Sequence, residues 1–206
     1  MLEMALKVRH KELQTFMKNY FQDIKKLISI IIEGSGDNHT RDGLKGTPER
    51  VANLYEELFS GYKKDINDIV NNSLFNTTLD DMIVVKNIEF SSICEHEMTP
   101  FFGMVNLGYI PNKKIIGLSK IPKIIEIFSK RLQVQENLTN QISTALDSVI
   151  SPHGLGVVVE ARHTCSIMRG DNFSSSNLIT SSMHGSFRSN SKTRQEFLSH
   201  IEKNIL

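Results

Sequence analysis

Two short stretches of the chain carry the side chains best suited to chemistry. They are SSICEHEMTPFFG (residues 91–103), which holds Cys94 and His96, and GVVVEARHTC (residues 156–165), which ends with His163 and Cys165. In each stretch a cysteine and a histidine lie two positions apart, and on an extended chain such residues share one face. Two pairs of this kind on two strands could converge on one tetrahedral metal ion, as a Cys₂His₂ zinc site.

The same residues also suit an inert protein interior. Free cysteine is among the most buried residue types, and an isolated histidine is often simply hydrogen-bonded. The spacing is not that of a zinc finger, so spacing alone leaves the metal site and the inert core both open. The two cysteines are 71 positions apart, which argues against a disulfide framework in a cytosolic chain.

A second group of side chains is basic or polar and could bind an anion. Its members are Ser119, Lys120, Lys123, Gln135, Glu136, Arg169 and Arg50. Lys120 and Lys123 lie near the start of a predicted helix, where free N–H groups favour an anion. The segment MRGDNFSSS (168–176) combines an arginine, a glycine and hydroxyl groups, as a phosphate cradle would. For each single lysine, the alternative is an ordinary solvated helix face.

The composition limits the class of protein. A hydrophobic content of 39%, a charged content of 23% and a net charge of +1 are typical of a folded globular chain. No overall field favours nucleic acid or a membrane surface, and no apolar run approaches the roughly 20 residues of a membrane span. The first residues lack the apolar core of a signal peptide. We therefore expect a cytoplasmic protein that binds neither nucleic acid nor membranes.

Hydrophobic periodicity predicts the elements that must position these residues. Apolar residues at helical spacing predict helices over 10–32, from Thr47 to about Gly61, and over 119–131, 133–150 and 194–205. Segments rich in β-branched and aromatic residues predict strands over 82–93, 104–111 and 156–165. Strands grouped between helices predict an α+β fold with an antiparallel sheet.

Several longer motifs, in this order along most of the chain, resemble the GTP cyclohydrolase I family. They are GLKGTPERVANLYEELFSGY (43–62), CEHEMTPFFG (94–103), IGLSKIPKIIEIFSKRLQVQENLTNQI (116–142), VVVEARHTCSIMRG (157–170) and SSMHGSFRSNSKTRQEFL (181–198). The resemblance implies the tunnelling fold, in which antiparallel sheets from several subunits close into a barrel. It also implies a homodecamer with active sites at subunit interfaces. In this scheme an N-terminal helical region (1–75) precedes a catalytic domain (76–206).

The resemblance further implies a hydrolase that acts on GTP. In such enzymes a Zn²⁺-activated water attacks C8 of the purine, the imidazole ring opens and formate leaves. The ribose then rearranges and closes a pterin ring, giving 7,8-dihydroneopterin triphosphate for folate or another pterin. Two thiolates favour a soft or borderline ion, so Fe²⁺ is the alternative to Zn²⁺.

Individual residues match the motif positions of the family. Cys94 and Cys165 match its two thiolate ligands, and His163 matches the general acid that protonates the purine. His96 and Ser119 match further catalytic residues near the ribose. The remaining matches are to substrate-binding positions: Glu136 for guanine, Gln135 for the ribose, and Lys120, Lys123, Arg169 and Arg50 for the triphosphate region. Arg50 is expected to come from a neighbouring subunit.

The sequence departs from the family at the metal motif. It reads Cys94-Glu95-His96-Glu97 where the family has Cys-Glu-His-His. Glu97 could ligate the metal directly, as carboxylates do at about 2.0–2.2 Å, and we predict Cys94, Cys165 and Glu97 as the ligands. Alternatively, His96 ligates and Glu97 acts as a base or supporting partner, which on a strand requires a bulge in the backbone. In the third alternative the metal is lost.

Two more departures add to this one. Lys123 stands where arginine is usual, and Asp171 stands where valine is usual. Together with Glu97 they leave two other functions open. One is a divergent enzyme that acts on another purine or pterin, or that stops at a ring-opened intermediate. The other is a non-catalytic protein that binds purine nucleotides.

Overall fold

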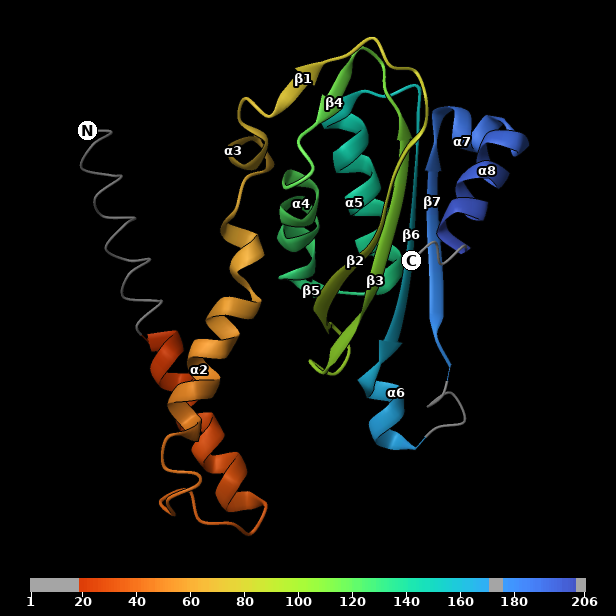
Figure 1. Ribbon diagram of the computed structural model, residues 1–206. Coiled ribbons are helices and arrows are strands. Elements are labelled where there is room, and N and C mark those ends of the chain that lie inside the picture. Colours follow the sequence, from red (N-terminus) through yellow and green to blue (C-terminus); the bar gives the residue numbers. More distant parts are fainter. Residues whose placement is uncertain (1–18, 171–175, 203–206) are drawn as a thin grey trace, which may run out of the picture. The chain divides into compact units, whose positions relative to one another are not determined.

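The computed structural model describes residues 19–170 and 176–202 (Figure 1). Cα packing divides the chain into two units, of which one ends at Leu58 and the other begins at Phe59. The domain boundary predicted after residue 75 stays a prediction, because compact packing alone does not define an independent domain. Asp171 and most of the proposed phosphate cradle lie outside the described residues.

From residue 19 onwards, the first unit consists of two helical segments joined by turns. Residues 19–34 are helical, and α2 (Thr47–Leu58) follows. The predicted start of this second helix is confirmed: Pro48 lies in the first turn, where its missing N–H costs nothing, and Glu49 lies beside the positive end of the helix dipole. Lys25 and Glu49 form an ion pair at 3.6 Å between the two helical segments.

The second unit is built on a five-stranded sheet in the order β5-β2-β3-β6-β7. Its strands are β2 (Ile83–Cys94), β3 (Pro100–Ile110), β5 (Leu132–Gln133), β6 (Gly154–His163) and β7 (Leu178–His184). All neighbours are antiparallel except β5, which pairs in parallel with the end of β2. A two-stranded sheet is formed by β1 (Leu74–Asn76) and β4 (Lys114–Ile116). The predicted α+β class with an antiparallel sheet is confirmed.

Helices cover both faces of the five-stranded sheet (Figure 1). One face carries α4 (Lys120–Ser129) and α5 (Gln135–Ile150), with the short η1 (Ser60–Lys63) and α3 (Ile66–Val70) beside α4. The other face carries α7 (Gly185–Ser189) and α8 (Ser191–Glu202).

The apolar run of β6 follows from this layering. Val157 and Val159 belong to the core under α4 and α5, whereas Val158 packs with Phe187 and Phe197 of the opposite layer. Successive strand residues point to opposite faces, so the part of the strand that is covered on both sides is apolar at successive positions.

The structure corrects the sequence analysis at both Cys–His pairs. The strand predicted over 156–165 ends at His163, and Cys165 belongs to a short helix, α6 (Thr164–Arg169). Likewise β2 ends at Cys94, and His96 lies in the following turn. Strand alternation therefore does not place either histidine beside its cysteine.

The structure also contains elements that the sequence patterns did not indicate: β1, β4, β5, β7, α3, α6 and α7. Most are short, and β7 (LITSSMH) has two apolar residues followed by three hydroxyl residues, without the apolar–polar alternation that marks a strand. Within residues 19–170 and 176–202, every helix is too short or too polar to span a bilayer.

Candidate functional site

The turn between β2 and β3 holds the first cysteine. Cys94 is buried at the end of β2, and both its main-chain N–H and its carbonyl form hydrogen bonds across the turn. Its carbonyl accepts from Met98 N at 2.9 Å, and its N–H donates to Thr99 O at 2.9 Å. Met98 adopts a left-handed conformation (φ 54°), which lets the chain reverse here. His96 and Glu97 therefore lie on an exposed turn and not on a strand.

The second cysteine comes from the first turn of α6. In the β3–β6 register Phe101 lies opposite His163, so the beginning of β3 brings the β2–β3 turn to the end of β6. The Cys94 and Cys165 thiols are in hydrogen-bonding contact. Cys94 Sγ also lies 3.7 Å from His96 Nδ1. The structure thus gathers Cys94, Cys165 and His96 from segments 71 positions apart.

Burial, followed by the neighbouring Cys94 and Glu97, raises the pKa of the Cys165 thiol. A raised pKa keeps the thiol protonated, and a metal ion must displace that proton because thiolates are the ligands. Two adjacent thiols fit a soft or borderline cation such as Zn²⁺ or Fe²⁺. Among the described residues, however, no three His, Cys, Asp or Glu side chains are arranged to hold a metal ion. The described chain supplies a thiol pair, and a metal site there would require a third ligand to move.

Glu97, predicted as that third ligand, forms an ion pair with Arg169 at the end of α6. The Glu97 side chain is 30% exposed and the Arg169 side chain 63%. The ion pair joins the β2–β3 turn to the helix that carries Cys165. The structure therefore brings Glu97 near the thiols but engages its carboxylate with a guanidinium.

His163 is held by two contacts at the other side of the site. Its Nε2 lies 2.9 Å from Gln135 Oε1, and its ring stacks on Phe101 with centroids 4.6 Å apart and planes 5° apart. Burial lowers the pKa of His163, and the carboxylate of Glu136 opposes that shift. The lowered pKa favours the neutral form of the His163 ring.

Gln135, predicted as a ribose contact, is completely buried at the start of α5. Its Nε2 donates to Val159 O at 3.0 Å, Leu178 O at 2.9 Å and Thr180 Oγ1 at 3.1 Å. Its neighbour Glu136, predicted to bind guanine, lies close enough to His163 to influence the pKa of that ring.

Gln135 begins a row of polar side chains that the sequence analysis missed. The row runs along α5 at every fourth residue, through Thr139, Ser143 and Asp147, and faces alternate residues of β7. Thr139 bonds Thr180 at 2.6 Å, and Ser143 bonds Ser182 at 2.7 Å and His184 at 3.1 Å. The four-residue spacing of these polar groups along one side of α5 was the available signal.

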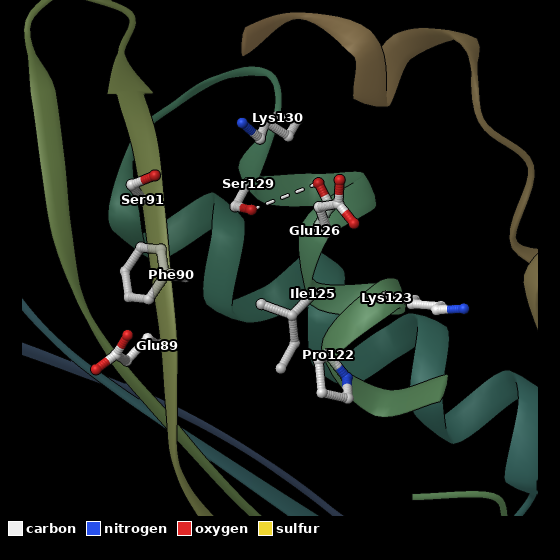
Figure 2. A pocket seen from close by; sticks show the side chains of 9 residues that line it. All are labelled: Glu89, Phe90, Ser91, Pro122, Lys123, Ile125, Glu126, Ser129 and Lys130. Atoms are coloured by element: carbon white, nitrogen blue, oxygen red, sulfur yellow. Dashed lines mark hydrogen bonds between the residues drawn. The ribbon is translucent and has the colours of Figure 1, made fainter. Parts of the chain in front are cut away.

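The residues predicted to hold phosphates are less closely gathered. Ser119 and Lys120 lie where α4 begins, and Lys123 follows one turn later. Lys123 lines a pocket between β2 and α4 (Figure 2), together with Glu89, Phe90, Ser91, Pro122, Ile125, Glu126, Ser129 and Lys130. The side chain of Lys123 points away from β2 in this view. In the described chain, no hydrogen bond or ion pair joins Lys120 or Lys123 to the thiols or to His163.

Arg50 belongs to the first unit, where its guanidinium bonds Thr47 Oγ1 at 2.7 Å. The structure therefore describes its local contacts within α2 and the preceding turn. Its predicted role at the site of a neighbouring subunit stays a prediction.

Comparison with known proteins identifies close relatives. The family model for GTP cyclohydrolase I matches residues 24–202. GTP cyclohydrolase 1 of Campylobacter jejuni (strain RM1221) is 49% identical over 185 residues, which cover 90% of this chain and 96% of the relative. The protein of that name from Leptospira biflexa is 47% identical, covering 86% and 97%. The human one is 47% identical, covering 84% of this chain and 69% of its own.

Proposed function

The chain belongs to the GTP cyclohydrolase I family, and from this premise we propose that it opens the imidazole ring of GTP, releases formate and forms 7,8-dihydroneopterin triphosphate. The predicted hydrolase class and GTP cyclohydrolase function are confirmed by the family match. The α+β fold, with helices packed on a mainly antiparallel sheet, agrees with the tunnelling fold of that family. One observation carries the finer proposal: the structure brings Cys94, Cys165 and His163 together from three elements.

Cys94 and Cys165 would hold the metal, for which we propose Zn²⁺ with Fe²⁺ as the alternative. When bound with an open position, such an ion supplies a water of lowered pKa. We propose His96 as the third ligand, because its Nδ1 already lies 3.7 Å from Cys94 Sγ. The requirement that the backbone leave the strand conformation is met, since His96 lies in a turn. Ligation by Glu97 would instead require its carboxylate to leave Arg169.

His163 would carry the proton for ring opening. Burial lowers the pKa of the ring, which makes its protonated form a stronger acid. The nearby Glu136 carboxylate favours the protonated form and keeps it accessible. Glu136 would at the same time accept hydrogen bonds from the N–H groups of guanine, which would set the purine beside His163.

The remaining predicted residues would bind the ribose and the triphosphate. These are Ser119, Lys120, Lys123, Arg169 and, from a neighbouring copy, Arg50. Assembly of several copies is supported by the sheet edge: β5 pairs only with Ile93 and Cys94, so most of β2 has no partner strand on its outer side in the described chain. Exposed strand edges favour pairing with a further strand. We propose a homodecamer in which such edges are paired.

A direct assay tests the proposed reaction. Purified protein is incubated with GTP, with Zn²⁺ in air and with Fe²⁺ under anaerobic conditions, and pterin fluorescence after oxidation and released formate are measured. We expect both products in at least one condition. Absence of both products in both conditions would contradict the proposal.

The other two functions give different outcomes in the same assay. A formylated, ring-opened nucleotide detected by mass spectrometry, without formate release, would indicate an enzyme that stops part-way. GTP binding without turnover would indicate a non-catalytic nucleotide-binding protein. In that case, activity gained on Glu97→His would show that Glu97 is the disabling change.

A further inference from the structure

The amide group of Gln135 has a defined orientation. Its Nε2 faces two main-chain carbonyl oxygens, Val159 O at 3.0 Å and Leu178 O at 2.9 Å. A carbonyl can only accept a hydrogen bond, so the NH₂ end of the amide must point at this pair. The reversed amide would place an oxygen against two oxygens in a fully buried position, which is strongly unfavourable. The amide oxygen is therefore the atom that faces His163.

This orientation fixes the hydrogen positions on the histidine ring. Gln135 Oε1 lies 2.9 Å from His163 Nε2 and can only accept, so Nε2 must carry a hydrogen. A neutral imidazole has one N–H, so its lone pair is then on Nδ1. A protonated ring keeps the Nε2–H, so the bond to Gln135 persists in both charge states. The proton is then gained and lost at Nδ1.

The ring plane is fixed by a second contact. Phe101 is fully buried and stacks on His163 with planes 5° apart. Stacking defines the plane but allows a half-turn that would exchange ring nitrogens with ring carbons. The bond to Gln135 opposes that half-turn. Together the two contacts define where Nδ1 points.

The Gln135 side chain is fully buried, and both ends of its amide are engaged within the protein. Its two N–H hydrogens serve three acceptors, of which the third is Thr180 Oγ1 at 3.1 Å. The Gln135 main-chain carbonyl accepts from Thr139 Oγ1 at 2.8 Å, which ties the start of α5 into the same network. A buried side chain with all its groups engaged acts through the groups that it touches.

We propose that Gln135 is a positioning residue, which holds His163 as the Nε2–H tautomer so that Nδ1 exchanges the proton with the purine. The proton transfer rests on the proposed function, whereas the tautomer does not require turnover. This role differs from the ribose contact that the family resemblance implies for Gln135. A ribose contact would act on substrate binding, and a positioning residue acts on the proton-transfer step.

The tautomer can be measured by magic-angle-spinning NMR on the full-length assembly labelled with ¹⁵N-histidine. The His163 signals are assigned by their loss in His163→Asn, at a pH of about 8.5, two units above the ordinary histidine pKa of about 6.5. We expect wild-type His163 to be neutral with hydrogen on Nε2 only. In Gln135→Met, which keeps the shape but removes the acceptor, we expect Nδ1–H signal to appear. The matched control Ser143→Ala alters the polar row two turns away and should leave the His163 signals unchanged.

Kinetics of the same variants separate the two roles. We expect Gln135→Met to lower kcat for GTP about ten- to hundredfold, the scale of a misplaced catalytic group, with KM changed less than about twofold. A raised KM with unchanged kcat would overturn the proposal in favour of a substrate contact. Hydrogen on Nδ1 in the wild type, or an unchanged tautomer in folded Gln135→Met, would also overturn it. If that variant does not fold, the wild-type spectrum alone decides.

Discussion

The two sides of the site are built differently. The thiol side consists of Cys94, Cys165 and the exposed turn with His96 and Glu97, joined by one ion pair to the end of α6. The histidine side consists of His163, the buried Gln135 and Phe101, held by several hydrogen bonds and an aromatic stack. The thiol side lacks a complete ligand set in the described chain, whereas the histidine side is already fixed by the protein.

This difference separates what a metal must do from what the fold does alone. Binding of a metal would order the turn and α6 around the thiols, because ligands gather as their protons leave. The histidine side needs no such step, since the Gln135 amide and His163 Nε2 are already hydrogen-bonded within the protein. Changes on the thiol side should therefore alter metal content first, and changes on the histidine side should alter proton transfer at constant metal content.

The largest effect is expected at the thiols. Cys165→Ser should remove stoichiometric metal and lower the rate of formate release at least about a thousandfold, since the proposed metal would lower the activation barrier by several kcal/mol. Metal per subunit by mass spectrometry and formate release check this. Ser166→Ala, at the next position of α6, is the control and should retain metal. Retained activity in metal-free Cys165→Ser would contradict the role of the thiol pair.

The next effect is expected at His163. His163→Asn should lower kcat about 10²- to 10⁴-fold, the usual contribution of a general acid, while metal content stays at the wild-type level. Single-turnover kinetics with GTP and metal analysis of the same sample measure both. Loss of metal together with activity would show that the two sides of the site are not separate.

A smaller effect is expected at Glu97. Glu97→Gln breaks the ion pair with Arg169, and partly exposed pairs contribute about 0–1 kcal/mol, so we expect up to about fivefold change in KM for GTP. Metal content should be unchanged. Glu95→Gln, on the same turn, is the matched control. If Glu97→Gln alone loses the metal, then Glu97 is the third ligand, as the sequence first predicted.

The smallest effect concerns stability and pH. Burial lowers the pKa of His163 below its value in the unfolded chain, so below pH about 6.5 the unfolded state binds more protons than the folded state. Folding stability should therefore decrease as the pH falls through 6.5 towards the lower folded-state pKa. Thermal unfolding between pH 8 and pH 5 measures this. His163→Asn should show a shallower decrease, and an identical decrease would contradict the assigned shift.

Residue types and hydrophobic periodicity predicted part of the site and most of the long helices. Cys94, Cys165 and His163 were candidates because few residue types bind metals or move protons, and the family resemblance then suggested their roles. Long periodic helices such as α5 were placed within one or two residues. The short helix α6 was not predicted, because six residues, TCSIMR, are too few to show a period. Its presence changes how Cys165 reaches Cys94.

The support of His163 could not be predicted from sequence for a different reason. Gln135 bonds main-chain carbonyls 24 and 43 positions away, on β6 and on the unpredicted β7. Main-chain carbonyls are present at every residue, so no residue type marks them as partners. Only the tertiary arrangement of α5 against the sheet reveals that the amide is engaged within the protein. The pairing of Glu97 with Arg169 is hidden in the same way, since either charge could have faced solvent.

The coordination of a metal bound to the protein tests the role of the thiol pair most directly. X-ray absorption spectroscopy at the metal edge is carried out on purified, metal-loaded protein, with Cys165→Ser protein loaded under the same conditions as the reference. The account predicts two sulfur neighbours at about 2.3 Å, with the remaining neighbours nitrogen or oxygen at about 2.0–2.2 Å, and fewer sulfur neighbours in the variant. A metal without sulfur neighbours, or full GTP turnover by protein that holds no metal, would contradict it.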